Sequence, residues 1–337
     1  MKATGFVRCA GAAVALAIVS ACSGGPAVAP STAGFNATYV GRTLFVNGRP
    51  VTAAHLRPAP RFASLVPDHH TRSKFEYVFS YYETYASIFN YPKSDRQIGQ
   101  INGDGGQGCT NVLYGYGHKT FWNVGGPTQI TEYKVPQTPI KTLTTGYVFP
   151  SSCAMNSSGD LAVGILYGTS YGRGGQIVLY KNGSGSGTVY TTPLDEEFFN
   201  GYDNKGDLFA DGFTGDRSGF ALVELPKGSS KFVTITTSNV ISFPGSVQWD
   251  GTYLTVLDQD SNAISRYTIS GTKATLKDTV TLTAGDCAQT WIVKNHVYCG
   301  DAGNDDGEVY NYPGGGAPVA VFAGYFDLPL GVVAAEK

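Results

Sequence analysis

A short pattern that recurs about every 45 residues constrains the fold of this chain more than any other feature. In each copy an apolar or β-branched run ends in Tyr, once in Leu, and a turn follows. Repetition at such a period is typical of arrays whose units cannot bury their apolar faces alone. The anchor positions are 42, 47, 45, 42 and 45 residues apart, and they are Tyr91, Tyr133, Tyr180, Leu225, Tyr267 and Tyr312.

A second pattern runs in phase with the first and indicates that the six units are sheets. A polar or glycine turn leads into an apolar strand in "GHKTFWNV", "SSGDLAVGI", "NKGDLFADG", "WDGTYLTVL" and "VKNHVYCGD". No long segment has the i, i+3, i+4, i+7 spacing of an amphipathic helix. We therefore predict an all-β fold, a six-bladed β-propeller with four-stranded blades.

The two ends of the repeat array predict how the ring closes. The first unit starts at "KFEYVFSYY", where a second strand is expected, and no inner strand precedes it. The last unit continues past its fourth strand into "LPLGVVAAEK". We predict that Leu330 to Ala335 forms the innermost strand of the first blade, beside Tyr77 to Tyr81. The propeller domain then covers residues 74–337.

The turn and strand sequences resemble those of known propellers. "NKGDLF" followed by "FALVELPKGS" is similar to the repeats of NHL-type and SMP-30/gluconolactonase-like propellers, and to those of uncharacterised bacterial propeller lipoproteins. The resemblance covers about residues 74–337 and implies the fold more than an activity, because propellers host many functions. The SMP-30 likeness implies a divalent-cation lactonase or esterase with Asn200 as a ligand and Glu197 and Asp286 near it. The otherwise neutral inner-strand starts count against that activity.

The N-terminal segment has the parts of an export signal. A short basic region precedes an apolar run at 9–19, which is shorter than the ~20 residues that span a bilayer. "VSAC" then resembles a lipobox, in which the chain is cleaved before Cys22 and that cysteine is lipidated. We expect residues 1–21 to be a lipoprotein signal peptide, and Ser23 favours the outer membrane or cell surface. An ordinary secretory signal is the alternative, and both export the chain.

Residues 22–73 differ in composition from the repeats. "SGGPAVAPSTAG" predicts a flexible tether. "RTLFVNGRPVTA" predicts a hairpin that turns at Asn47-Gly48. This segment is therefore expected to be a tether and lead-in.

Four cysteines remain after the signal and Cys22, and an oxidising compartment favours their pairing: Cys109, Cys153, Cys287 and Cys299. Four cysteines allow three pairings. Cys109 and Cys153 lie one repeat apart, each just before an inner strand, which favours a disulfide between them at the channel mouth. Cys287–Cys299 then follows by elimination, although a hairpin near Asn295 would put Cys299 opposite Trp291.

The loops expected at one end of the propeller are acidic, whereas the opposite turns carry lysines. The net charge of −2 then conceals two ends of opposite charge, of which the acidic one attracts cations or cationic groups. Chance clustering of solvating polar loops is the alternative. The candidate ligand-binding residues are Glu197, Asn200, Asp216, Arg217, Asp258, Asp286 and Asp301, together with Tyr81 and Tyr82.

Aromatic residues of the same loops form a second candidate surface. Tyr81, Tyr82 and Tyr85 in one loop, and Tyr167 and Tyr171 in another, can stack on sugar or peptide ligands. Packing between blades is the alternative. "DAGNDDGE" at 301–308 has the composition of a calcium loop, but its acids miss the D-x-D-x-D-G register. No cofactor is therefore expected, with calcium kept as the alternative.

No catalytic constellation is found in this sequence. His118 and His296 fall on turns at the opposite end, so a histidine general base has no candidate. The net charge argues against a nucleic-acid partner. The favoured hypothesis is a non-enzymatic binding module, held at the cell envelope by its lipid, for a small molecule, peptide or envelope protein. A divalent-cation lactonase and a structural assembly partner are the alternatives.

Overall fold

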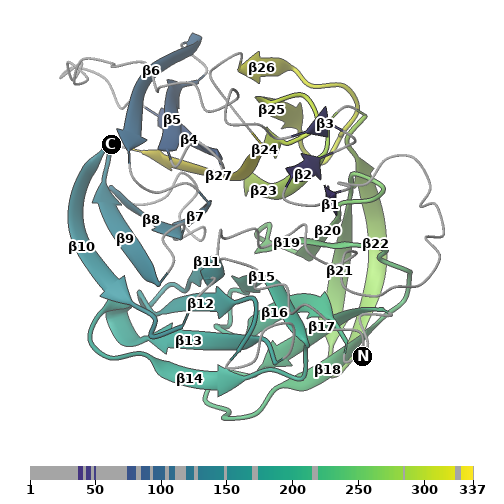
Figure 1. Ribbon diagram of the computed structural model, residues 1–337. Helices are drawn as coiled ribbons and strands as arrows, with labels where there is room; N and C mark the ends of the chain where they lie inside the picture. Colours follow the sequence, from purple (N-terminus) through teal and green to yellow (C-terminus); the bar gives the residue numbers. More distant parts are fainter. Residues whose placement is uncertain are drawn as a thin grey trace, which may run out of the picture.

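The computed structural model is an all-β molecule whose sheets stand in a nearly closed ring around a central axis (Figure 1). Within the residues it describes, helical geometry is confined to the 3-10 turn η4 (Lys181–Gly183), and none of the helices found there is long and apolar enough for a membrane span. The structure describes residues 37–40, 43–46, 49–50, 74–80, 85–91, 94–102, 106–110, 119–124, 128–147, 150–168, 174–214, 219–283, 285–322 and 328–336.

The first three units of the ring are separate four-stranded antiparallel sheets. Unit 1 contains β27 (Pro329–Glu336), β4 (Lys74–Ser80), β5 (Tyr85–Asn90) and β6 (Ser94–Asn102). Unit 2 contains β7 (Gln107–Cys109), β8 (Thr120–Val124), β9 (Gln129–Lys134) and β10 (Thr138–Thr144). Unit 3 contains β11 (Pro150–Met155), β12 (Leu161–Ile165), β13 (Gln176–Tyr180) and β14 (Thr188–Thr191).

The remaining units follow the same strand order, but two of them share one sheet. Unit 4 contains β15 (Glu196–Tyr202), β16 (Leu208–Phe213), β17 (Phe220–Leu225) and β18 (Val233–Thr237). Unit 5 contains β19 (Pro244–Trp249), β20 (Leu254–Asp258), β21 (Ala263–Ser270) and β22 (Lys273–Thr281). Unit 6 contains β23 (Cys287–Val293), β24 (His296–Asp301), β25 (Asp306–Asn311) and β26 (Ala320–Phe322).

Units 4 and 5 are joined into an eight-stranded sheet, which the sequence did not predict. The outer strands β18 and β22 run parallel where Thr236 lies beside Lys273 and Thr237 beside Ala274. The pairing uses backbone groups that an edge strand otherwise leaves unpaired. The expectation of separate four-stranded sheets is therefore confirmed only in part.

The C-terminal strand closes unit 1, as predicted. β27 pairs with β4 in an antiparallel register that runs from Pro329 opposite Ser80 to Glu336 opposite Lys74. Leu330, Val332 and Val333 on this strand are buried. The first and last strands of the ring are therefore held by one sheet, although they come from opposite ends of the repeat array.

The repeated anchor position lies in the second half of the third strand of each unit or directly after it, and at Tyr180 and Tyr267 the side chain ties neighbouring units together. The hydroxyl of Tyr180 in unit 3 donates to the carbonyl of Thr144 in unit 2. Tyr267 in unit 5 donates to Asn239, which follows β18 of unit 4. A buried hydroxyl needs such a partner, which explains why Tyr recurs where Leu or Val would also fill space.

Both expected disulfides are present, with two corrections to their positions. Cys109–Cys153 links β7 to β11 within the buried inner strands rather than at the channel mouth. In unit 6, Thr290 rather than Trp291 lies opposite Cys299, and a register shift between Cys287 and Thr290 brings the two cysteines together. The bulge was not visible in the sequence. Two disulfides indicate an oxidising, extracytoplasmic environment.

Outside the ring, the described N-terminal residues form a three-stranded sheet of β1 (Ala37–Val40), β2 (Thr43–Val46) and β3 (Arg49–Pro50). Val46 lies opposite Arg49. The predicted turn residues, Asn47 and Gly48, lie outside the described residues.

Candidate functional site

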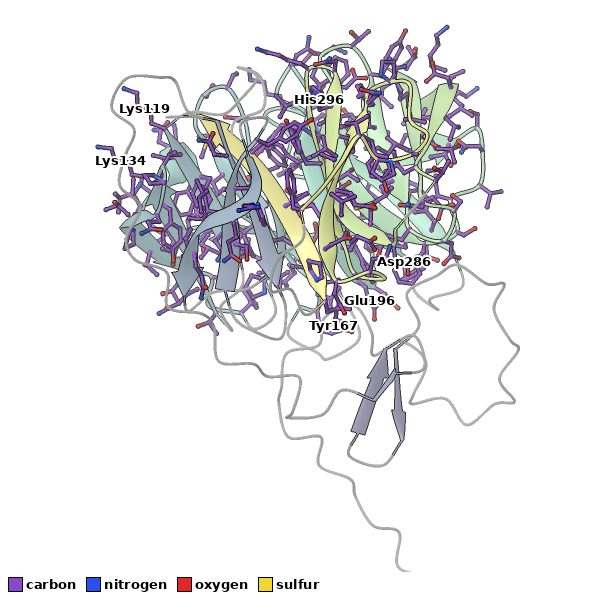
Figure 2. The ribbon with its side chains drawn as sticks, turned by 90° about the horizontal axis from the view of Figure 1, so that it is seen from above. Lys119, Lys134, Tyr167, Glu196, Asp286 and His296 are labelled. Carbon is purple, nitrogen blue, oxygen red and sulfur yellow. A yellow bond between two sulfur atoms is a disulfide. The ribbon has the colours of Figure 1, made fainter. Side chains whose placement is uncertain are left out.

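The two ends of the ring differ in chemistry, because alternate turns of antiparallel strands lie at opposite ends. Figure 2 shows Tyr167, Glu196 and Asp286 at one end and Lys119, Lys134 and His296 at the other. The first end is formed by the turns between units and by the turns between second and third strands. We call it the carboxylate end because of its acidic residues. Its described acidic residues are Asp195, Glu196, Asp258, Asp260, Asp286, Asp301, Asp305 and Asp306.

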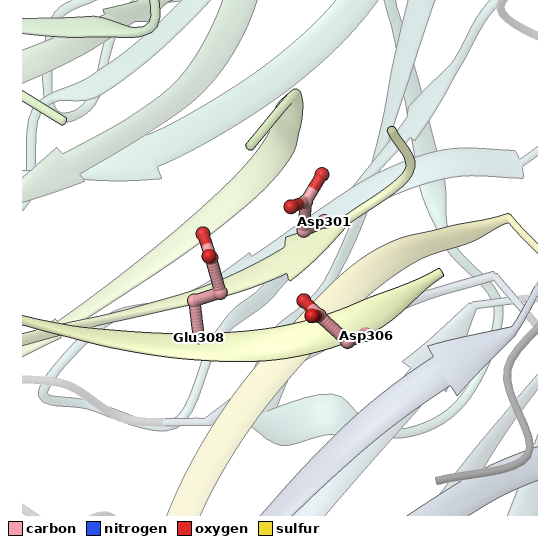
Figure 3. A group of neighbouring side chains, drawn as sticks. All are labelled: Asp301, Asp306 and Glu308. Carbon is pink, nitrogen blue, oxygen red and sulfur yellow. The ribbon is translucent and has the colours of Figure 1, made fainter. Parts of the chain in front are cut away.

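Three carboxylates converge at the carboxylate end of unit 6 (Figure 3). Asp301 ends β24, and Asp306 and Glu308 lie on β25, with Asp301 directly opposite Asp306 in the register. One oxygen from each of the three lies within 4.8 Å of the others. We call Asp301, Asp306 and Glu308 the acidic triad.

The members of the acidic triad differ in how well they are satisfied. Asp301 accepts backbone N–H groups from Asp286 at 2.7 Å and Gly303 at 2.8 Å, and the side-chain amide of Asn304 at 2.7 Å. Glu308 accepts the Tyr310 hydroxyl. The Oδ1 atom of Asp306 is enclosed but has no hydrogen-bond donor. The triad therefore has unused acceptor capacity.

Burial and repulsion between carboxylates make ionisation of Asp306 and Glu308 unfavourable. Burial, followed by the nearby Asp301 and Glu308, raises the pKa of Asp306 to about 7. Burial also raises the pKa of Glu308, against the lowering effect of the Tyr310 hydrogen bond. Such shifts are what a carboxylate cluster shows when no cation balances it.

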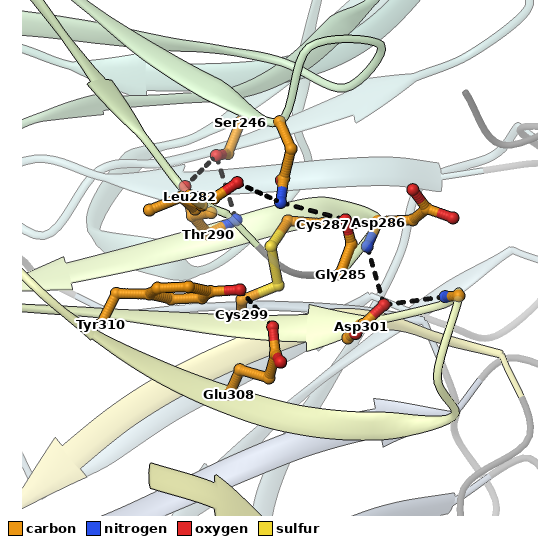
Figure 4. Close-up of a disulfide and its surroundings, with 12 residues drawn as sticks. Ser246, Leu282, Gly285, Asp286, Cys287, Thr290, Cys299, Asp301, Glu308 and Tyr310 are labelled. Atoms are coloured by element: carbon orange, nitrogen blue, oxygen red, sulfur yellow. Dashed lines mark hydrogen bonds between the residues drawn. A yellow bond between two sulfur atoms is a disulfide. The ribbon is translucent and has the colours of Figure 1, made fainter. Parts of the chain in front are cut away.

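A glycine keeps the space beside the triad open. Gly285 has a φ of +78°, and a Cβ there would lie 2.7 Å from oxygens of both Asp301 and Glu308. Figure 4 shows Gly285 and the Cys287–Cys299 disulfide next to these side chains. The disulfide joins the strand that follows Gly285 to β24, so it holds the loop and the triad in one position.

Two predicted site residues, Asp286 and Asp301, are brought together, whereas Asp258 lies in unit 5 with a structural role. Asp258 accepts the N–H of Phe243 at 3.0 Å and of Asp260 at 3.2 Å, and the hydroxyl of Ser261 at 3.0 Å. These contacts tie the start of β19 to the turn after β20. Asp258 is therefore occupied within its own unit.

Glu197 and Asn200 lie together on β15, but both face the neighbouring unit instead of an open mouth. Glu197 is fully buried. Its oxygens accept the hydroxyl of Ser151 at 2.8 Å, that of Ser152 at 3.0 Å and the Asn200 amide at 3.1 Å. A Cβ on Gly164 would collide with this carboxylate. Burial raises the pKa of Glu197 to about 7, against these hydrogen bonds.

This arrangement does not fit the cation site that the SMP-30 likeness implies. Glu197 and Asn200 use each other as partners, and among the described residues the groups of three or more potential metal-ligating side chains do not include Glu197. The amide oxygen of Asn200 lacks a donor, yet it borders a central cavity of ≈ 10 Å³. A space of that size suits about one water molecule. We therefore derive no reaction at this position.

The sequence does not reveal the surroundings of two groups of acidic residues. In the sequence, Asp306 and Glu308 belong to the calcium-like segment 301–308, whose acids do not match the linear register of a calcium-binding loop. Their actual arrangement comes from the β24–β25 hairpin, which sets Asp301 opposite Asp306. Asp211 on β16 is fully buried, and burial raises its pKa well above the usual range. The alternation of side chains along "LFADGF" gives no sign that the carboxylate of Asp211 is buried.

Several predicted site residues lie outside the described residues, namely Cys22, Tyr81, Tyr82, Asp216 and Arg217. Tyr167 is described, and its side chain is buried within an apolar cluster with Phe198 and Phe213. Packing between units, rather than a stacking surface, accounts for Tyr167.

Similar folds occur in solved structures of very different sequence. A functionally unknown protein from Desulfotomaculum acetoxidans DSM 771 is 12% identical, with a TM-score of 0.50 over 77% of this chain and 98% of that one. A chain of the nidogen/laminin complex is 10% identical, with a TM-score of 0.55 over 78% and 98%. Apo AztD from Citrobacter koseri is 10% identical, with a TM-score of 0.48 over 79% and 98%.

The sequence matches no protein-family model and no curated protein. At such low identity the likeness to solved structures concerns the fold alone. The resemblance to NHL-type and SMP-30-like propellers stays a prediction.

Proposed function

We propose that this chain is an exported, lipid-anchored six-bladed β-propeller of the cell envelope, and that it acts as a binding module. In this proposal the carboxylate end takes a divalent cation, or a ligand with a cationic group, at the acidic triad. The six units are the blades, each with four strands. Catalysis is not part of the proposal.

The proposed fold is supported by the agreement between sequence and topology. Six anchor positions fall at equivalent strand ends, and β27 pairs with β4 across the ring closure. The fold also occurs in a chain of the nidogen/laminin complex. That likeness supports a binding role only by analogy of fold.

The binding site is supported chiefly by the unused Asp306 oxygen beside two further carboxylates. Hard cations such as Ca²⁺ take carboxylate and carbonyl oxygens as ligands. Asp301, Asp306 and Glu308 offer such oxygens within 4.8 Å of one another. The space that Gly285 leaves open is where a cation would be held. Burial, and after it repulsion from the neighbouring carboxylates, raises the pKa of Asp306, and a bound cation would offset the repulsion.

Export and anchoring are supported by the two disulfides, which suit an oxidising compartment, and by the lipobox that ends at Cys22. The anchor itself is tested by metabolic labelling with a fatty acid. We expect the chain to be labelled, and Cys22→Ser to abolish the label.

The binding site is tested by thermal unfolding of the chain from Ser23 onwards, with calcium and with a chelator. Ligand at 100 times its Kd stabilises a protein by about 2.7 kcal/mol. For a domain of this size we expect a rise in Tm of roughly 5–10 °C. Asp306→Asn should abolish the rise, since it removes the charge of the least satisfied ligand.

Glu197→Gln is the matched control, because Glu197 is also a buried carboxylate with a raised pKa. The calcium response should survive in this variant. A response that persists in Asp306→Asn, or that disappears in Glu197→Gln, would contradict the proposed site and favour the cation enzyme instead. No response to any divalent cation in the unaltered chain would sink the cation proposal.

A further inference from the structure

The end of the ring opposite the carboxylate end presents exposed lysines from five units. They occupy the turns between first and second strands and between third and fourth strands, so they lie at one level of the ring. Figure 2 shows Lys119 and Lys134 there. We call this the lysine end, and its described exposed lysines are Lys119, Lys134, Lys181, Lys205, Lys227, Lys231, Lys273 and Lys294.

The acidic residues of the lysine end offset only part of this charge, because the described ones on its turns are the four aspartates Asp160, Asp203, Asp207 and Asp250. Asp203 is buried, and one of its oxygens accepts N–H groups from Lys205, Gly206 and Asp207 at 2.8–2.9 Å. Asp250 accepts two turn N–H groups at 2.7 Å. Among the described residues of this end, no Asp or Glu is fully exposed.

The chain also joins the ring at the lysine end. β4 starts at Lys74, which pairs with Glu336 at the far end of β27. Inner strands run from the carboxylate end to the lysine end, so residue 74 and residue 336 both lie at the latter.

We propose that the lysine end lies against an anionic lipid surface. The excess of exposed lysines over aspartates on these turns and the level arrangement of the turns point to that orientation. Each lysine near an anionic surface adds about 1 kcal/mol, which is about fivefold in affinity, within a Debye length of ~8 Å. The carboxylate end then faces away from the lipid and is open to its ligand. The orientation rests on the proposed envelope location, but not on cation binding.

The test measures flotation of the unlipidated chain, starting at Ser23, with vesicles. Neutral phosphatidylcholine vesicles are compared with vesicles that also contain phosphatidylglycerol, at low and at physiological salt. We expect binding to the anionic vesicles only, weakened by salt. Lys205→Gln with Lys294→Gln should weaken this binding by about twenty-fivefold, from about fivefold per lysine.

The matched control compares single variants: Lys277→Gln removes one charge from the outer strand β22, whereas Lys205→Gln removes one charge from the lysine end. Lys277→Gln should change vesicle binding less than twofold and Lys205→Gln about fivefold, while both single variants keep the Tm of the unaltered chain. Equal binding to neutral vesicles, equal weakening by the control, or binding to a soluble polyanion without binding to vesicles would overturn the proposal. Cation binding at the acidic triad is measured separately, so either proposal can fail alone.

Discussion

The carboxylate end and the lysine end are built from turns of the same strands, yet their acidic residues differ in how fully hydrogen-bond donors satisfy them. At the lysine end Asp203 is surrounded by backbone N–H donors. At the carboxylate end Asp301 has similar partners, but Asp306 beside it has an oxygen with none. The number of acidic residues at an end therefore does not tell how much acceptor capacity is free. The supply of turn N–H groups decides it.

The largest expected effect comes from deleting β27, the strand that runs from the carboxylate end to the lysine end. Deletion of Pro329 to Lys337 removes the burial of Leu330, Val332 and Val333, at about 1.5–3 kcal/mol each. The sum, roughly 5–9 kcal/mol, is comparable to the whole stability of a domain. We expect urea unfolding to lose its single cooperative transition. Removal of Lys337 alone is the control, and an intact transition after the full deletion would show that β27 does not close the ring.

A smaller effect compares the structural acids of the two ends. Asp203→Ala and Asp258→Ala each leave several partly buried donors without an acceptor, at a cost of about 1–3 kcal/mol. Lys205→Gln, at the same turn as Asp203, should change the free energy of unfolding by less than about 0.5 kcal/mol. Urea titration measures all three. If Asp258→Ala cost nothing, Asp258 would return to the set of ligand-binding candidates.

The smallest effect concerns the pH dependence of the acidic triad in the presence of a chelator. The pKa of Asp306 is raised to about 7, so its protonated form is favoured by folding. Stability from this group is present below about pH 4 and is lost as pH rises towards 7. Asp306→Asn should therefore be more stable than the unaltered chain at pH 8, by ~1 kcal/mol after allowance for partial exposure, and no different at pH 4.

Asp195→Asn changes the charge at the same end outside the triad and serves as the control for this pH effect. Its difference from the unaltered chain should not vary between pH 4 and pH 8. If Asp306→Asn were less stable at pH 8 without any cation, the carboxylate would be structural, and the contrast between the two ends would disappear.

Sequence alone determined the features that depend on spacing along the chain. The anchors from Tyr91 to Tyr312 marked equivalent strand ends, and the surplus strand at 330–335 predicted its pairing with β4. The one-repeat separation of Cys109 and Cys153 predicted their disulfide. The alternation of turns also separated acidic from basic loops. All of these follow from the repeat spacing along the chain, which can be read from the sequence without knowing any contact between units.

Only the tertiary structure decided which side chains meet across strands and units. Glu197 looked like a ligand at a channel mouth, but Ser151 and Ser152 of the neighbouring unit enclose it. Asp306 became a candidate because the β24–β25 register sets it opposite Asp301. A bulge or a parallel edge contact shifts such pairings by one residue without changing the repeat. Those pairings decide which donors reach a side chain and how deeply it is buried, so the repeat spacing along the chain does not determine either property.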